Sequence, residues 1–364
     1  MMAQIGIRGM TGSAPEATAP STRLIKGLPA IVFLFLVGCN VSSTAIAPAP
    51  VTAELKGGSN YDFFDIQGCN RDPYGVLLNY NLASATINAQ LAAMYAAGQR
   101  RIGIYIYHWD GNLFIDGKLT VYNGPVSGTL VDSTGGVLSS QVQANLANLL
   151  AAIKAAGFEQ VVVGMGPQGA NHMSTWPSWQ ESYFQENWEV IENVRPIIVA
   201  SGMDYLLDLF TEGMPNKALP FYAFQLEYVQ RIWQLYAAKY GTADTVGFSL
   251  SGQPGVEVEP PNVYGGVYPP LYDVHIYDDA YNQFMRVNAA MKQQPANPPW
   301  IIGEAYYNDS AEAVALQQAI AFTGKQVKYL TQWQLTSGTT DACFNTGVNV
   351  APPALFSNYM SSGF

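Results

Sequence analysis

Two glutamates end apolar runs of the sequence, at positions where a carboxyl group can do chemistry. Glu212 closes residues 205–212 (YLLDLFTE), and Glu304 stands near the end of residues 300–305 (WIIGEA). A carboxylate at the end of such a run is costly to bury unless it is hydrogen-bonded or paired. A single glutamate there usually marks a solvated strand end, whereas two carboxyl groups brought together can divide the roles of proton donor and nucleophile. The fold must therefore bring the two runs together.

The two glutamates belong to a series of eight short runs rich in strand-forming residues. Each run ends in polar, Gly or Pro residues, and near-continuous apolar strands of this kind fit a parallel sheet covered on its outer face. The predicted strands are residues 60–67, 101–109, 160–166, 205–212, 245–251, 272–277, 300–305 and 327–335.

Helical patterns separate these strands. The clearest is residues 140–156, where a 3.6-residue period places five apolar side chains on one face: Val142, Leu146, Leu149, Leu150 and Ile153. The Pro- and Gly-rich residues 252–271 are predicted to contain no helix. The other predicted helices are residues 83–97, 184–200, 221–239, 280–292, 311–323 and a short one at 353–359.

Eight alternations of strand and helix predict an α/β fold, the (β/α)8 TIM barrel, as one domain over residues 59–364. Such barrels take roughly 250 residues. A doubly wound open sheet has the same alternation, but no Gly-rich phosphate loop opens the first helix here. A barrel places its functional residues at the carboxyl ends of the strands, where both glutamates stand.

Together with the two glutamates, four segments resemble motifs of the clan A glycoside hydrolases, a large set of retaining glycosidases on (β/α)8 barrels. AAGQRRIGIYIYHW and YDVHIY resemble strands two and six of that clan, and IIGEAYYN resembles its strand-seven motif. Trp333 in TQWQL resembles the Trp that ends strand eight and floors the sugar pocket. The resemblance covers nearly all of residues 60–340 at the level of motifs and identifies no single family.

The resemblance implies a role for each matched residue. Glu212 takes the place of the acid/base after strand four, and Glu304 that of the nucleophile after strand seven. Arg101 would support the nucleophile and keep it ionised by charge pairing. His275 and Tyr277 would face the site, and Tyr277 would donate a hydrogen bond to Glu304.

Carboxylate chemistry and the resemblance together predict a double displacement. Glu304 would attack the anomeric carbon and form a covalent glycosyl-enzyme. Glu212, held protonated by the negative charge of its neighbour, would protonate the leaving oxygen and then activate water. Retention of configuration requires the two carboxyl groups to lie roughly 5–5.5 Å apart.

One position departs from the clan's pattern. The clan usually has Asn directly before the acid/base, where it bonds the sugar 2-hydroxyl, and this chain has Thr211 there. Asn216 and Ser251 are the alternatives for that contact. Asp208 is a second candidate acid, expected to lie deeper on the same face.

Further side chains are candidates for substrate contacts. His108 and Trp109 end the second strand and His172 follows the third, so all three are predicted to line the cleft. Trp176 and Trp179 either line it as well or pack against the following helix. Three His and three Cys are too few for a zinc cluster, and neither a metal nor another cofactor is predicted.

The composition narrows the class of partner. The net charge of −10 disfavours nucleic acid, which binds basic surfaces. Because 49% of the residues are hydrophobic and 12% are charged, the chain has material for a large core and is not disordered. Its 22 Tyr and 7 Trp offer flat faces that suit sugar rings as well as ordinary cores.

The N-terminus is predicted to be an export signal. Residues 28–37 (LPAIVFLFLV) follow two basic residues and are too short to span a bilayer, which needs about 20 residues. The ending LVGC resembles the bacterial lipobox, so residues 1–39 would be a lipoprotein signal peptide and Cys39 the lipidated residue. Residues 40–58 would be a flexible tether. The protein would then be an exported, membrane-anchored lipoprotein on the periplasmic or outer-membrane side; the alternative is a buried helix with a chance cysteine.

Export would leave Cys69 and Cys343 as one pair outside the cytoplasm, where disulfides persist. They follow the first and eighth strands, which are neighbours in a closed barrel, so they are predicted to form a disulfide. The alternative is two unpaired thiols.

The leading hypothesis is therefore a lipid-anchored retaining glycosidase that acts on an extracellular or cell-envelope polysaccharide. Long predicted loops after strands two, three and five favour an open cleft and endo action. A non-catalytic glycan-binding lipoprotein on the same barrel is the second hypothesis, supported by Thr211. A structural envelope lipoprotein is the third, and it predicts no proximity of Glu212 and Glu304. The sequence does not decide the oligomeric state.

Overall fold

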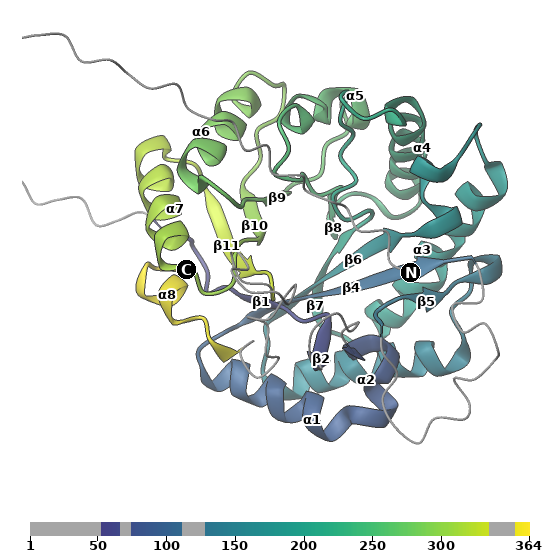
Figure 1. Cartoon of the computed structure of the whole chain (residues 1–364), viewed down its shortest axis with the longest axis horizontal. Coiled ribbons are helices and arrows are strands. Elements are labelled where there is room, and N and C mark those ends of the chain that lie inside the picture. The colour runs from purple at the N-terminus through teal and green to yellow at the C-terminus, as the bar shows by residue number, and fades with distance from the viewer. Residues whose placement is uncertain (1–51, 66–73, 111–127, 335–353) are drawn as a thin grey trace, which may run out of the picture. The chain divides into compact units, whose positions relative to one another are not determined.

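Eight parallel strands form the inner layer of the molecule (Figure 1). The computed structural model describes residues 52–65, 74–110, 128–334 and 354–364. The strands are β1 (Gly58–Asn60), β4 (Arg101–Trp109), β6 (Gln160–Pro167), β7 (Asp204–Asp208), β8 (Thr245–Gly247), β9 (Tyr272–His275), β10 (Trp300–Glu304) and β11 (Val327–Gln332).

The strand order shows that the sheet is rolled into a barrel. Hydrogen bonds join the strands in the order β8-β7-β6-β4-β1-β11-β10-β9, so the first and last barrel strands, β1 and β11, are neighbours. The two ends of this path also meet: the Leu250 amide donates to the Asp273 carbonyl at 2.9 Å, and the His275 amide donates to the Leu250 carbonyl at 2.8 Å. The predicted (β/α)8 barrel is confirmed, and the open doubly wound sheet is wrong.

Helices surround the strands on the outside (Figure 1). The α2 helix has the predicted bounds, because its local signals are strong: the Ser139 hydroxyl accepts from the Val142 amide at 3.3 Å, and Gly157 ends it in a left-handed conformation. All five apolar residues of its predicted face are buried. The helices are α1 (Val76–Ala96), α2 (Ser140–Ala156), α3 (Glu181–Ala200), α4 (Tyr222–Tyr240), α5 (Pro260–Tyr264), α6 (Ala280–Met291), α7 (Ser310–Thr323) and α8 (Ser357–Ser361).

The first barrel strand differs from the prediction of residues 60–67. It is β1, which lies earlier, and part of the predicted run forms β2 (Phe63–Asp65), which pairs antiparallel with β3 (Tyr74–Gly75). The Tyr61 amide still donates to the Gly103 carbonyl of β4 at 2.8 Å. The chain then leaves the barrel, because the Asp62 and Phe63 amides donate to the Gln334 side chain at 2.8 and 3.2 Å.

Two further boundaries differ. The α1 helix begins seven residues before the prediction and contains a kink, since Ala83 has φ −127° and ψ 19°. Residues 252–271, predicted to lack a helix, contain α5 and a 3₁₀ turn at Val256–Val258. Pro260 opens α5, where its fixed φ suits the first helical turn and its missing amide costs no hydrogen bond.

The core has two parts, one inside the barrel and one outside. Successive strand residues point to opposite faces. The residues that alternate with the helix-facing ones form a small apolar cluster that fills the barrel, below the end that carries Glu304. The inner cluster consists of Val162, Leu206, Val246, Ile301 and Tyr329.

A short strand, β5 (Val131–Asp132), extends the sheet beside β4. Among the described helices, none is both long and apolar enough to serve as a membrane span.

The outer core can be tested at α2. We expect Leu146→Ala, at a fully buried side chain, to lower the free energy of unfolding by about 2–5 kcal/mol, because it leaves a cavity. Val314→Ala on α7, where the side chain is 45% exposed, should change it by at most about 0.5 kcal/mol. Chemical denaturation of the two variants measures both, and an equal loss would contradict the packing described.

Candidate active site

Glu212, His275 and Glu304 meet at the carboxyl ends of the barrel strands. One side-chain atom from each of the three lies within 4.8 Å of those of the other two. Glu304 is the last residue of β10 and pairs in register with His275, the last residue of β9. Glu212 follows the end of β7 by four residues. Side chains almost a hundred residues apart thus share one end of the barrel.

His275 lies between the two carboxylates. Its Nδ1 is 3.1 Å from Glu212 Oε1 and 3.3 Å from Glu304 Oε2, and its side chain is fully buried. Burial alone would lower the pKa of His275, but Glu304, Glu212 and Asp273 raise it well above its usual value. The imidazole is therefore a buried cation at neutral pH.

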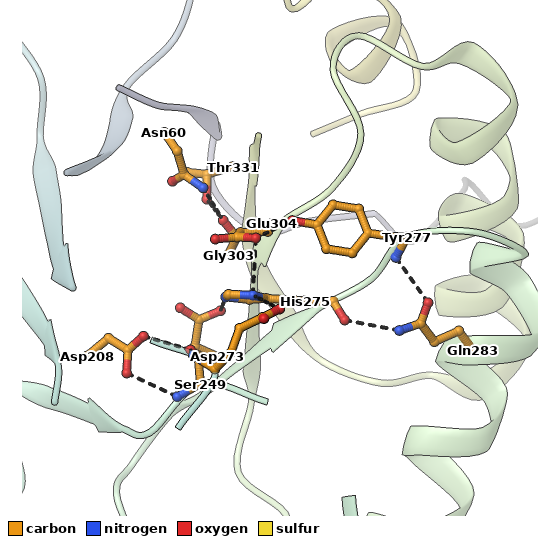
Figure 2. A network of polar contacts seen from close by, with 11 residues as sticks. Asn60, Asp208, Ser249, Asp273, His275, Tyr277, Gln283, Gly303, Glu304 and Thr331 are labelled. Carbon is orange, nitrogen blue, oxygen red and sulfur yellow. Dashed lines mark hydrogen bonds and ion pairs between the residues drawn. The ribbon is translucent and has the colours of Figure 1, made fainter. Parts of the chain in front are cut away.

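Glu304 is buried and held ionised. Burial alone would raise its pKa, yet the charge of His275 and hydrogen bonds from His275, Tyr277 and Tyr105 lower it below the usual range. The Tyr277 hydroxyl donates to Glu304 Oε2 (Figure 2). Burial and the nearby carboxylates raise the pKa of Tyr277 well above 10, so this phenol keeps its proton as a donor.

The backbone around these groups is fixed by side-chain hydrogen bonds (Figure 2). Gln283 on α6 accepts from the Tyr277 amide at 3.0 Å and donates to the His275 carbonyl at 3.2 Å. Asn60 and Thr331 donate to the Gly303 carbonyl at 2.9 and 2.6 Å. The end of β10 is thereby anchored to both β1 and β11.

Glu212 lies on a loop and not on a strand as predicted. The β7 strand ends at Asp208, because the Phe210 amide turns back to the Asp208 carboxylate at 3.3 Å and the Thr211 amide donates to the Met165 carbonyl at 2.7 Å. Glu212 has a positive φ of 54°, which is uncommon outside glycine. Its side chain is 46% exposed, whereas that of Glu304 is 8% exposed. One carboxylate thus faces solvent while the other is enclosed.

Asp208, the second candidate acid, is fully buried below this loop. Burial raises its pKa to about 6 against the opposing hydrogen bonds from Ser249. Both of its oxygens accept hydrogen bonds, from the Ser249 amide at 3.0 Å, the Ser249 hydroxyl at 2.7 Å and the Phe210 amide. These bonds give Asp208 a role in holding the loop.

The predicted pairing of Arg101 with Glu304 is wrong. Arg101 begins β4 and lies 2.8 Å from Glu159, and it donates to the Lys56 carbonyl at 3.0 Å. Tyr105, which reaches Glu304, is four residues further along the strand, or roughly 13 Å at 3.3 Å per residue. The cation against Glu304 is His275.

His108 is also misplaced by the prediction. Strand alternation puts it on the face opposite Tyr105, where its Nδ1 lies 3.0 Å from the Ser133 hydroxyl. Burial lowers the pKa of His108 to about 3, so it is neutral. Trp109, on the same face as Tyr105, packs closely over Gly169, where a Cβ would come within 2.4 Å of the ring. A substrate contact of Trp109 stays a prediction.

Two of the aromatic candidates, His172 and Trp333, lie close to the cluster of Glu212, His275 and Glu304. His172 packs edge-on against Phe210, next to the Glu212 loop, with ring centroids 5.6 Å apart, and burial lowers its pKa to about 4. Trp333 packs against Tyr105 at 5.9 Å, which places it beside the Glu304 cluster. Their contacts with substrate stay predictions.

Trp176 packs against Tyr228 of helix α4, at a centroid distance of 6.3 Å, whereas the prediction named the helix that follows it, which is α3. Trp179 packs against both Trp176 and Phe184 of α3. These two indoles belong to the outer core.

Sequence reasoning missed Tyr105 and Ser249. Inward alternation along IYIYHW was the available signal for Tyr105, whereas nothing local marked Ser249. The side chain of Asn216 is already bonded: its Oδ1 accepts from the Ala218 backbone amide at 2.9 Å, and its Nδ2 donates to the Pro254 carbonyl at 3.4 Å. The buried Thr211 hydroxyl has no hydrogen-bond partner among the described residues.

Two carboxylates and an imidazole also form a possible donor set for a divalent cation. A metal would require neutral His275, and the raised pKa of this residue opposes that. The arrangement is better suited to moving protons and presenting an ionised carboxylate. Cys39, Cys69 and Cys343 lie outside the described residues, so the lipidation and the disulfide stay predictions.

No family model matches this chain, and no curated protein matches its sequence. Solved structures match its fold. A GH5_18 protein from Bifidobacterium longum subsp. longum, in complex with Manβ1-4GlcNAc, aligns at 10% identity and TM-score 0.54 over 85% of this chain and 78% of that chain. A glycoside hydrolase 5 lichenase from Caldicellulosiruptor sp. F32, in complex with cellotetraose, aligns at 11% identity and TM-score 0.50 over 85% and 93%.

An exo-β-1,4-mannosidase from an Opitutaceae bacterium aligns at 14% identity and TM-score 0.49 over 76% of this chain, and this chain spans about half, 51%, of that protein's length. At the identities of the first two structures, the likeness establishes the fold. This chain has a (β/α)8 barrel that family 5 glycoside hydrolases of clan A also adopt.

The protonation of the cluster can be measured by NMR of the three imidazoles. We expect His275 to be protonated at pH 7 and His108 and His172 to be neutral. Glu304→Gln should lower the pKa of His275, because it removes the carboxylate that raises it most among its neighbours. A neutral His275 in the wild type, or an unchanged pKa in the variant, would contradict this geometry.

The same two groups set a pH window for stability. The lowered pKa of Glu304 stabilises the fold above its ordinary value of 4.5, and this is lost as pH falls through the folded pKa. The raised pKa of His275 stabilises it below 6.5, and this is lost as pH rises through the folded pKa. Glu304 and His275 therefore both contribute fully to the stability of the fold between pH 4.5 and pH 6.5.

Proposed function

We propose that this chain is a retaining glycoside hydrolase that cleaves a polysaccharide by double displacement, with Glu304 as nucleophile and Glu212 as acid/base. The observation that carries the proposal is the approach of Glu212 and Glu304 to within 4.8 Å, side-chain atom to side-chain atom, at the carboxyl end of the barrel. Retaining glycosidases hold their carboxyl groups roughly 5–5.5 Å apart, and inverting ones roughly 6.5–9.5 Å. The separation favours the retaining mechanism.

The lowered pKa of Glu304 supports its role in the first step. Its carboxylate attacks the anomeric carbon, and the bond from that carbon to the leaving oxygen breaks. Glu212 enters this step protonated, gives its proton to that oxygen and becomes a carboxylate. The hydrogen bond from Tyr277 orients Glu304 for the attack.

The exposure of Glu212 supports its role in the second step. Its side chain is 46% exposed, so water can reach it while the sugar is bound to Glu304. Glu212 takes a proton from that water, the water oxygen bonds to the anomeric carbon, and the ester to Glu304 breaks. His275 lies against both carboxylates and compensates the negative charge that they share.

The substrate class rests on the resemblance and on the ligands of the structural neighbours. Those neighbours were solved with Manβ1-4GlcNAc and cellotetraose, so β-1,4-linked mannosides and glucans are the first substrates to test. We propose an extracellular or cell-envelope polysaccharide and endo action. The half-buried Trp333 beside Tyr105 suits the floor of a sugar site.

The nucleophile can be identified by trapping. An activated 2-deoxy-2-fluoro β-glycoside should label Glu304, found by mass spectrometry of the digested protein, and Glu304→Gln should take no label and lose activity by about 10⁴-fold or more. Glu312→Gln is the matched control, because Glu312 is as buried as Glu304, at 6%, but bonds to Tyr359 of α8. Label on another residue would overturn the assignment.

Thr211 favours a second candidate, a glycan-binding protein without catalysis, because the clan's Asn is missing there. A panel of polysaccharides separates the two. Release of new reducing ends supports the hydrolase, and binding without release supports the binding protein.

Export is part of the proposal and is supported by the sequence of the N-terminus. Cys39 would be lipidated and would become the N-terminus once the residues before it are removed, and residues 40–58 would tether the barrel to the membrane. In a bacterial host fed a labelled fatty acid, the full chain should carry label and sediment with membranes, and Cys39→Ser should lose both. Label that persists in the variant would contradict the lipobox.

A further inference from the structure

A chain of hydrogen bonds runs from Asp208 through Ser249 to the backbone of Glu212. Asp208 Oδ2 accepts the Ser249 hydroxyl at 2.7 Å, and Ser249 Oγ accepts the Glu212 amide at 2.6 Å. Asp208 and Ser249 are both fully buried, and Figure 2 shows them beside His275 and its cluster. Three different segments contribute: the end of β7, the residues after β8, and the loop that carries Glu212.

The direction of this chain is fixed by its chemistry. A serine hydroxyl has one hydrogen and accepts with its lone pairs, and here the hydrogen goes to Asp208. The Asp208 carboxylate also accepts the Ser249 amide at 3.0 Å, so the serine is held at two points. Its oxygen is left to accept the amide hydrogen of Glu212. This oxygen is therefore the group that holds the Glu212 amide, while the neighbouring Thr211 and Met214 amides donate to the Met165 and Ser249 carbonyls.

The backbone that Ser249 holds, at Glu212, has an unusual conformation. Glu212 has φ 54°, a left-handed conformation that a non-glycine residue keeps when its surroundings impose it. The same conformation directs its carboxylate to His275, at 3.1 Å. The side chain is half exposed, so packing around it does not explain its position.

We infer that Ser249, with its hydroxyl oriented by Asp208, is the positioning residue for Glu212. The inference rests on the proposed function, in which Glu212 is the acid/base. Loss of the serine oxygen releases the Glu212 amide and lets the loop relax. Glu212 then gives its proton to the leaving oxygen less effectively, while Glu304, on β10, is left in place.

Leaving-group dependence tests this role, since a merely structural loss would affect all substrates alike. For Ser249→Ala we expect kcat on phenyl β-cellobioside to fall about 10–100-fold, less than the full contribution of general acid–base catalysis, which reaches about 10⁴-fold. On 2,4-dinitrophenyl β-cellobioside, whose leaving group needs no proton, the rate of the first step, measured by burst kinetics, should fall less than about threefold. Equal losses on both would overturn the inference.

Ser133→Ala is the matched control. Ser133 is equally buried, and its hydroxyl bonds the Glu186 carboxylate as well as His108, but it lies outside the Glu212 loop. It should leave the ratio of the two rates unchanged. A ratio shifted as in Ser249→Ala would mean that any buried hydroxyl has this effect, and would overturn the inference.

Crystal structures of the wild type and Ser249→Ala decide the positioning role even if the wild type cleaves no glycoside. We expect Glu212 to leave the left-handed conformation and its contact with His275 in the variant. An unchanged loop would overturn the inference, whereas an inactive wild type with a displaced loop in the variant would overturn the proposed function alone.

Discussion

A buried imidazolium between two carboxylates is the interaction on which the site depends. His275 has no exposure to solvent, and its charge is tolerable there because Glu212 and Glu304 lie within 3.1 and 3.3 Å of Nδ1. The same charge keeps Glu304 ionised in a buried position. Removing Glu304 changes the ionisation of His275, and removing His275 changes that of Glu304. The cluster therefore behaves as a unit, and its donors, Tyr277 and Tyr105, complete the environment of one carboxylate.

The cluster lies where the two ends of the sheet path meet. Asp208, Ser249, His275 and Glu304 belong to, or directly follow, four successive barrel strands, β7 to β10. The β8 and β9 strands are joined through the backbone of Leu250, which bonds both Asp273 and His275. Side-chain bonds thus add to backbone pairing at this seam. Burial favours the protonated form of the acids there: it raises the pKa of Asp208 to about 6 and that of Asp273 to about 7. The charge of His275 lowers both of these pKa values and so opposes the effect of burial.

Several features of the fold followed from local sequence. The bounds of β4 and α2 agree with the prediction because their signals are local, an unbroken β-rich run in one and a capped 3.6-residue period in the other. The first strand did not agree, because the side chain of Gln334, more than 270 residues away, binds the amides that would have continued it. A contact of that range leaves no mark on the local pattern.

The sequence by itself determined that Glu212, His275 and Glu304 stand at or near the ends of apolar runs, and in a barrel such ends meet at one rim. Tertiary structure decided which charges face each other. Arg101 and His108 belong to the same strand as Tyr105, yet strand length takes Arg101 to the opposite end and alternation takes His108 to the opposite face. The left-handed backbone of Glu212 and its bond to Ser249 were likewise decided by the closing of the barrel. Residue type and spacing fix which groups can react, whereas register and closure fix the few ångströms that determine their partners.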